Sequence, residues 1–256
     1  MEPVLNIAAY RFAHLPDARE LQPGLLQAAR SLDLKGTILL AEEGINLVLA
    51  GTPQAISEMV GTLRGDSRLA DMDIKESWSA AQPFRRLRVK VKAEIIRMNQ
   101  PAIRPAAGRA PAVDPLTLKR WLDQGHDDTG RPVVTLDTRN GFEVDHGAFD
   151  NCLDWRLEKF SDFPQALARH RDELTGKTVV SYCTGGIRCE KAAIALQDAG
   201  IANVHQLDGG ILRYFERAGA HHFRGRCFVF DERVALAPDQ DADAASAARR
   251  QRCITE

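Results

Sequence analysis

Residues 178–193 constrain the fold of this 256-residue chain more than any other segment. The run Thr178–Tyr182 is apolar and β-branched, two adjacent glycines follow it, and Cys189, Ala192 and Ala193 then recur at helical spacing. A buried strand, a glycine turn and a helix in this order are typical of a parallel α/β sheet. Such sheets bind ligands at the carboxyl ends of their strands. The segment therefore predicts a parallel α/β domain with a site just after this strand.

The loop after this strand carries Cys183 and Arg188, our candidate catalytic residues. The two glycines allow backbone N–H groups to point inward as an anion-binding nest, and the positive end of the following helix favours negative charge. We therefore expect the pKa of Cys183 to lie below the roughly 8.5 of free cysteine. A buried cysteine beside an ordinary turn is the alternative, which the coincidence of these features disfavours. The residues between the two, which complete the active-site loop, are Thr184, Gly185, Gly186 and Ile187.

The length of this loop and a second thiol refine the interpretation. Four residues separate Cys183 from Arg188, whereas cysteine phosphatases cradle a phosphoryl group in a longer loop. The shorter ring resembles that of the sulfur-transferring rhodaneses, so phosphate chemistry is the less favoured interpretation. Cys189 has two interpretations that stay open. It is either a thiol that resolves an oxidised or persulfidated Cys183 or a core-packing residue.

Cysteine and histidine positions argue against a disulfide framework and against a metal centre. The chain has five cysteines, an odd and scattered set without a Cys-x-x-Cys pair,. His221 and His222 are adjacent, and adjacent histidines rarely bind one ion. We predict no metal site, and no dinucleotide-binding or facial-triad pattern indicates another cofactor.

Composition limits the partners and the compartment. The net charge is only −1, so binding to a polyanion requires a local basic patch. No stretch approaches the roughly 18 uncharged apolar residues of a membrane span. The first residues also lack the basic and apolar regions of a secretory signal. We therefore expect a cytoplasmic protein that makes no membrane contact.

The first part of the chain alternates strand and helix patterns in the order βαββαβ. Gly36 is expected to close the first helix, and residues 42–44 are expected to form a hairpin turn. This order predicts a ferredoxin-like domain, with two helices on one face of an antiparallel sheet. Strands are expected at 4–12, 37–41, 45–50, 73–78 and 87–96, and helices at 21–32 and 53–63,.

A proline-rich segment separates this domain from the α/β domain. Residues 99–115 contain four prolines and no apolar period,. Beyond it, strands at 133–136, 178–182 and 204–207 alternate with helices, and a last strand is expected at 228–236,. The expected organisation is a ferredoxin-like domain at 1–98, a linker at 99–115, a rhodanese-like α/β domain at 116–220, an extension at 221–237 and a disordered tail at 238–256.

A basic stripe lies near the end of the first domain. Because side chains alternate along a strand, Arg86, Arg88, Lys90 and Lys92 share one face, while Leu87, Val89 and Val91 turn to the core,. Such a stripe suits contacts with RNA phosphates. A solvated strand face that happens to be basic is the alternative.

Several motifs together resemble the rhodanese-type tRNA uridine hydroxylases. They lie in both domains, and the resemblance runs from about residue 4 to about residue 236. The motifs are Gly36-Thr-Ile-Leu-Leu-Ala-Glu-Glu-Gly-Ile-Asn46, Pro83-Phe-Arg-Arg-Leu-Arg-Val-Lys-Val-Lys92, the segment Cys183–Ala193, Gln206-Leu-Asp-Gly-Gly-Ile-Leu-Arg-Tyr-Phe-Glu216 and Gly225-Arg-Cys-Phe-Val-Phe-Asp-Glu-Arg-Val234.

This resemblance implies a specific activity. It implies oxygen-dependent 5-hydroxylation of the wobble uridine, position 34, of tRNA, with molecular oxygen as co-substrate. It also implies that Cys183 is the essential residue, of the persulfide type. The cysteine pairs in the tails of longer relatives have no counterpart here, so a metal-binding tail is not carried over. Neither the electron donor nor a protein partner is indicated.

Two other functions remain compatible with the residues themselves. The first is a rhodanese-type sulfurtransferase, in which Cys183 carries sulfane sulfur as a persulfide. The second is a non-catalytic adaptor for RNA binding or sulfur relay, in which the loop serves only for docking. The hydroxylase is the leading interpretation.

Overall fold

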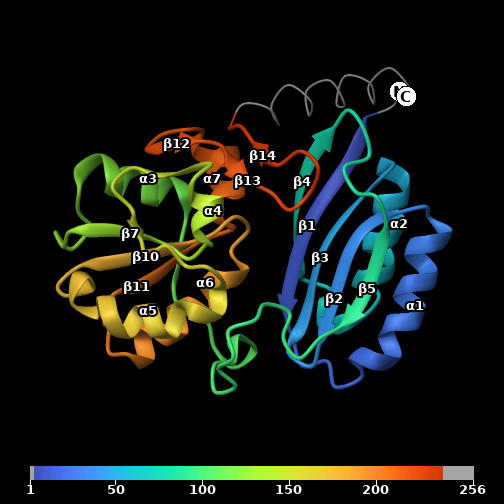
Figure 1. Cartoon of the computed structure of the whole chain (residues 1–256), viewed down its shortest axis with the longest axis horizontal. Helices are drawn as coiled ribbons and strands as arrows, with labels where there is room; N and C mark the ends of the chain where they lie inside the picture. Colours follow the sequence, from blue (N-terminus) through green and yellow to red (C-terminus); the bar gives the residue numbers. More distant parts are fainter. Residues whose placement is uncertain (1–2, 239–256) are drawn as a thin grey trace. The chain divides into compact units, whose positions relative to one another are not determined.

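The computed structural model describes residues 3–238, and within them the chain divides into two compact units (Figure 1). The first unit comprises residues 3–96 and 230–234, and the second comprises residues 97–229 and 235–238. The tail expected to be disordered lies, from residue 239 on, outside the described residues. No helix within residues 3–238 is long and apolar enough to cross a membrane.

The first unit is a five-stranded sheet with two helices on one face (Figure 1). The strand order is β4-β1-β3-β2-β5, and the β4-β1-β3-β2 part is antiparallel as the sequence predicted. Its elements are β1 (Val4–Phe12), α1 (Ala18–Ser31), β2 (Lys35–Ala41), β3 (Gly44–Gly51), α2 (Pro53–Arg64), a 3₁₀ turn (Ser67–Leu69), β4 (Asp73–Ser79) and β5 (Leu87–Val91).

The last strand of this sheet corrects the prediction in two respects. β5 pairs with β2 in the parallel direction, so the sheet is mixed and not wholly antiparallel. β5 also ends at Val91, whereas the apolar pattern predicted a strand to Ile96. Ile95 is instead held outside the strand by its backbone N–H, which donates to the Glu43 carboxylate at 2.7 Å.

The core of the first unit follows the alternation of its strands. Leu5 and Ile7 of β1 and Ile38 of β2 are buried together with Ile56 and Met59 of α2. Each fully buried aliphatic side chain contributes about 1.5–3 kcal/mol relative to exposure. The face that carries these residues is therefore fixed against the helices.

Gly36 has a role that the sequence pattern did not predict. The first helix ends at Ser31, and Gly36 lies within β2 with φ of +128°. A Cβ atom there would lie 2.1 Å from the carbonyl oxygen of Val48 in β3. Glycine is therefore required because β2 and β3 approach closely at this point, and not to end a helix.

The second unit is a parallel sheet in the order β6-β11-β10-β7-β9, which confirms the predicted α/β fold. In Figure 1, α3 and α7 lie on one side of this sheet and α5 and α6 on the other. Its elements are β6 (Ala112–Val113), α3 (Pro115–Gln124), β7 (Val133–Asp137), α4 (Gly141–Val144), β8 (Gly147–Phe149), β9 (Leu153–Asp154), α5 (Phe163–His170), β10 (Thr178–Tyr182), α6 (Ile187–Asp198), β11 (Val204–Leu207), α7 (Gly210–Ala218), β12 (Phe223–Gly225), β13 (Cys227–Phe228) and β14 (Ala235–Leu236).

The segment 99–115, expected as a linker, contributes to this second sheet. Its short strand β6 pairs in parallel with β11, and Arg109 forms an ion pair at 2.6 Å with the buried Glu190 of α6. The amide of Gln206 also donates to the carbonyl oxygen of Ala110 at 3.2 Å. The segment contains four prolines and has no apolar periodicity. The sequence pattern therefore did not predict that it packs against the second sheet.

The predicted final strand at 228–236 is instead a hairpin. β13 and β14 pair in the antiparallel direction, with Cys227 opposite Leu236. The intervening residues turn because the Asp231 carboxylate accepts the backbone N–H and the guanidinium of Arg233, each at 2.9 Å. Such an aspartate turn competes with continued strand pairing.

We predict that Gly36→Ala lowers the free energy of unfolding by at least about 2 kcal/mol, because alanine is strained at this φ and its methyl group meets the Val48 carbonyl. Gly24→Ala is the matched control. A Cβ at Gly24, within α1, has nothing within 4 Å, so this variant should be neutral or more stable by up to about 1 kcal/mol. Denaturant unfolding measures both, and equal stabilities would contradict the role given to Gly36.

Candidate active site

The loop after β10 holds the sulfur of Cys183 at its centre. β10 is fully buried and ends at Tyr182, so Cys183 stands at the carboxyl end of a central strand. The backbone N–H of Gly186 donates to the Cys183 sulfur at 3.1 Å. α6 starts at the next residue, Ile187, which points the positive end of that helix at the same sulfur,. Cys183 itself is fully buried.

The start of α7 fixes the direction of the loop peptides. The N–H of Ile211 donates to the carbonyl of Cys183 at 2.9 Å, and the N–H of Leu212 donates to the carbonyl of Thr184 at 3.1 Å. Because these carbonyls are turned outward, the loop N–H groups are free to face the sulfur. Gly210 makes this approach possible, since it has φ of +66° and a Cβ there would lie 2.5 Å from the Cys183 carbonyl oxygen.

Arg188 is held by a residue that the sequence analysis missed. Both Arg188 and Glu143 of α4 are buried, and they form two hydrogen bonds at 2.5 and 2.8 Å. Glu143 also accepts the backbone N–H of Asn140 at 3.0 Å. The available signal was the spacing Asn140-x-x-Glu143, a capping pattern at the start of a helix. That pattern predicts a helix start but says nothing about a distant arginine.

A second buried ion pair lies in the same part of the unit. Asp137, at the end of β7, and Arg139 are both fully buried and pair at 2.6 Å. Arg139 also lies over the ring of Tyr182, 5.7 Å from its centroid. Both residues follow the strand predicted at 133–136, and the sequence pattern predicts no role for either. A buried charge is tolerated only when it is paired and hydrogen-bonded, as it is here.

The surroundings of Cys183 lower its pKa to about 5. Burial acts against ionisation and is the largest single influence. It is outweighed by the hydrogen bond from Cys189, by the charge of Arg188 and by the backbone N–H groups of Arg188 and Gly186. The pKa shift therefore lies in the direction expected for an anion-binding loop.

Cys189 lies beside Cys183 and has the opposite character. It is fully buried, and burial together with the neighbouring Cys183 raises its pKa well above the ordinary thiol value. Its sulfur lies 3.8 Å from the hydroxyl oxygen of Thr138. Cys189 is thus both a core residue and a hydrogen-bond donor to Cys183.

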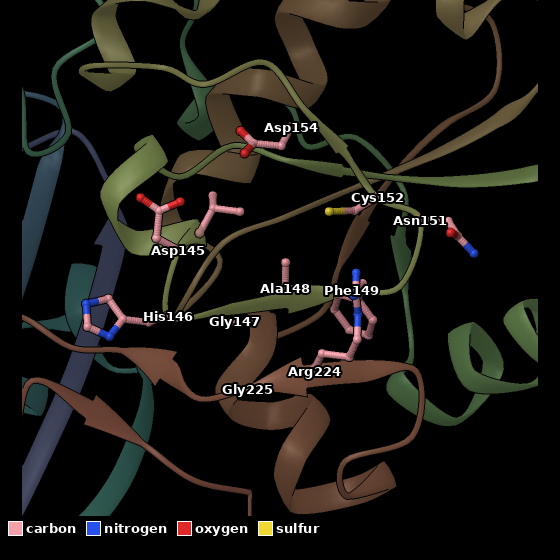
Figure 2. A pocket seen from close by; sticks show the side chains of 11 residues that line it. Asp145, His146, Gly147, Ala148, Phe149, Asn151, Cys152, Asp154, Arg224 and Gly225 are labelled. Atoms are coloured by element: carbon pink, nitrogen blue, oxygen red, sulfur yellow. The ribbon is translucent and has the colours of Figure 1, made fainter.

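Cys152, His221 and His222 lie apart from this loop, whereas Cys227 is buried beside Thr184 and burial raises its pKa to about 12. Cys152 lines a cavity of about 500 Å³ beside β8 and β12 (Figure 2), and no residue of the 183–188 loop lines that cavity. His222 pairs with Asp123 at 2.7 Å, whereas the His221 carbonyl accepts the hydroxyl of Tyr214. Within residues 3–238 no three His, Cys, Asp or Glu side chains are grouped to hold a metal ion.

The basic stripe has the predicted alternation. Val89 is buried in the core of the first unit, and Leu87 and Val91 pack against that core. The structure thus brings Cys183, Arg188 and Cys189 together in the second unit, whereas the stripe belongs to the first unit. All four basic side chains are exposed: Arg86, Arg88, Lys90 and Lys92.

Two domain families match the chain and define its class. The UPF0176 acylphosphatase like domain matches residues 4–95, and the rhodanese-like domain matches residues 114–216. An acylphosphatase-like domain has the ferredoxin-like arrangement of the first unit,. The chain is thus a two-domain protein of the rhodanese class.

Relatives of almost equal length define the family. Proteins named tRNA uridine(34) hydroxylase from Variovorax paradoxus, Delftia acidovorans and Bordetella petrii are 62%, 61% and 61% identical to this chain. The alignments cover 98%, 93% and 93% of this chain and 95%, 91% and 94% of the relatives. The chain therefore belongs to the tRNA uridine(34) hydroxylase family, which confirms the resemblance found in the sequence.

We predict that Cys183 titrates with a midpoint near pH 5. The measurement is the ultraviolet absorbance of the thiolate at each pH, taken as the difference between the wild type and Cys183→Ser. In Arg188→Met with Glu143→Gln the midpoint should rise by less than about 1 pH unit, because Glu143 already neutralises most of the positive charge that is lost,. Both residues are changed because Arg188→Met alone leaves Glu143 buried and unpaired, at a cost of about 3–5 kcal/mol.

Cys152→Ser is the control for this titration, because it removes a thiol outside the loop. Its midpoint should equal that of the wild type. A wild-type midpoint near that of free cysteine would contradict the anion-binding role of the loop.

Proposed function

We propose that this chain catalyses the oxygen-dependent 5-hydroxylation of the wobble uridine, position 34, of tRNA in the cytoplasm, with Cys183 as the essential active-site residue. The observation that carries the proposal is a buried thiol of lowered pKa in a rhodanese-type loop, within a chain 62% identical to a protein named tRNA uridine(34) hydroxylase. The charge of Arg188 and the backbone N–H groups of Gly186 and Arg188 stabilise the negative charge on the sulfur.

The overall reaction requires molecular oxygen as co-substrate. One oxygen atom enters the C5–H bond of uracil, and the other leaves as water with two electrons and two protons from a donor, for which we propose a dithiol. A thiolate can assist because it is a nucleophile for C6 of the uracil ring. Addition at C6 makes C5 electron-rich, and elimination of the thiolate after oxygen transfer and loss of the C5 proton restores the ring.

Cys189 is a candidate resolving thiol for this cysteine. Its hydrogen bond to Cys183 brings the two sulfurs together, and its raised pKa keeps it protonated. If a peroxide oxidises Cys183 to the sulfenic acid, the Cys189 thiol gives its proton to the departing hydroxide as its sulfur attacks, which forms a disulfide and releases water. This protects Cys183 from irreversible oxidation.

Loss of the chain should remove 5-hydroxyuridine derivatives from position 34 of tRNA. In a strain that lacks the gene, the wild type and Cys152→Ser should restore these nucleosides, whereas Cys183→Ser should not, because its hydroxyl does not ionise at neutral pH. Nucleoside mass spectrometry of total tRNA is the measurement. Unchanged nucleosides in the deletion strain would rule out the hydroxylase.

The same variants separate the two other functions. Restoration by Cys183→Ser would favour a non-catalytic adaptor. Transfer of sulfur from thiosulfate to cyanide that depends on Cys183, with unaltered tRNA, would favour a sulfurtransferase. Of these two alternatives, the length of the loop supports the sulfurtransferase more directly.

We propose that the basic stripe of the first unit binds tRNA phosphates. Lys90→Glu with Lys92→Glu should weaken tRNA binding by at least about tenfold and reduce its salt dependence, since fewer counterions are released on binding. Arg19→Glu with Arg30→Glu makes the same change in charge at exposed positions of α1 and should have a much smaller effect. Equal binding by the two double variants would contradict this role.

A further inference from the structure

Three aromatic side chains of the second unit form a group at the edge of the active-site loop. Phe142 and His146 come from α4 and the residues just after it, and Phe228 comes from β13. The ring centroids of Phe142 and Phe228 are 5.3 Å apart, and those of His146 and Phe228 are 5.2 Å apart. We call these three residues the aromatic group.

The contacts that hold the active-site loop also hold this group. Glu143, the residue after Phe142, binds Arg188 through both carboxylate oxygens. The carbonyl of Phe228 accepts the hydroxyl of Thr184, the residue after Cys183, at 3.3 Å. The aromatic group is therefore linked to the loop at each of its two ends.

Phe142 differs from most aromatic side chains of this unit in its exposure. Its side chain is 48% exposed, whereas Phe149, Phe160 and Phe163 are buried. Phenylalanine contributes most to stability when it is buried. The ring of Phe142 therefore leaves about half of its surface open beside the residue that anchors Arg188.

We propose that the aromatic group is the stacking site for the base of nucleotide 34, with Phe142 as the principal positioning residue. This inference rests on the proposed function. Single-stranded RNA loops are recognised by stacking of their unpaired bases on aromatic side chains. Each stacked base contributes about 1–3 kcal/mol, which offsets the cost of drawing the base out of the anticodon stack.

The site complements the basic stripe in chemistry. The stripe offers charge for phosphates, which carry no sequence information, whereas the aromatic group offers a face for one base. His146 adds ring nitrogens that can hydrogen-bond to the oxygens and N3–H of uracil. The base is thus held beside the loop that contains Cys183.

Photochemical crosslinking tests the placement without turnover. An anticodon stem-loop with 5-iodouridine at position 34 is irradiated with the full-length protein, and the adduct is mapped by mass spectrometry. The expected adduct is on Phe142 or Phe228. An adduct confined to residues outside 140–146 and 226–228, with the stem-loop bound, would overturn the inference.

Kinetics of two variants separate stacking from simple packing. Phe142→Leu keeps an apolar side chain but removes the ring, and should lower kcat/KM for tRNA by about 10- to 100-fold. Phe142→Tyr keeps the ring and should stay within about threefold of the wild type. Leu116→Ala removes an exposed apolar side chain from α3 and should not change the kinetics.

The titration midpoint of Cys183 distinguishes a positioning role from a structural one. It should be the same in Phe142→Leu and the wild type, because stacking does not involve the loop. A shifted midpoint with equal losses in the leucine and tyrosine variants would overturn the inference in favour of a packing role. If wild-type tRNA is not hydroxylated, the proposed function fails, whereas the crosslink still reports whether the aromatic group binds base 34.

Discussion

The outward orientation of two carbonyl groups is the constraint on which the active-site loop depends. The first N–H groups of α7 bind the carbonyls of Cys183 and Thr184, and this leaves the loop amides to face the sulfur. The approach of α7 is possible only because Gly210 has no Cβ. Gly210, more than twenty residues away in the sequence, thus determines whether backbone N–H groups or carbonyl groups face the Cys183 sulfur.

The charge of Arg188 is less available to the thiolate than the sequence suggests. Glu143 neutralises most of it through two short hydrogen bonds, so the buried site carries little net positive charge. This is consistent with the hydrogen bond from Cys189 being the largest of the influences that lower the Cys183 pKa, ahead of Arg188. Glu143 is nevertheless needed, because an unpaired arginine at this depth would be costly.

The sequence predicted the elements that are regular and buried, and missed the contacts between them. β7, β10 and β11 have their predicted bounds or nearly so, because fully buried parallel strands appear as apolar runs. Glu143 and the Asp137–Arg139 pair were missed because an ion pair between distant segments leaves no periodic pattern. Gly36 was misassigned for a related reason, since a glycine after a helix and a glycine in a close strand pair look identical without the partner strand.

The burial of Cys183 reconciles a reactive thiolate with a stable protein. A thiol with a pKa near 5 is ionised at neutral pH and, if exposed, would react with any oxidant in the cell. In this structure it is fully buried, and the hydroxyl of Thr184 links the loop to the Phe228 carbonyl of β13. A single neutral hydrogen bond of this kind contributes only about 1 kcal/mol. Access to the sulfur is therefore limited by its burial and not by this one hydrogen bond.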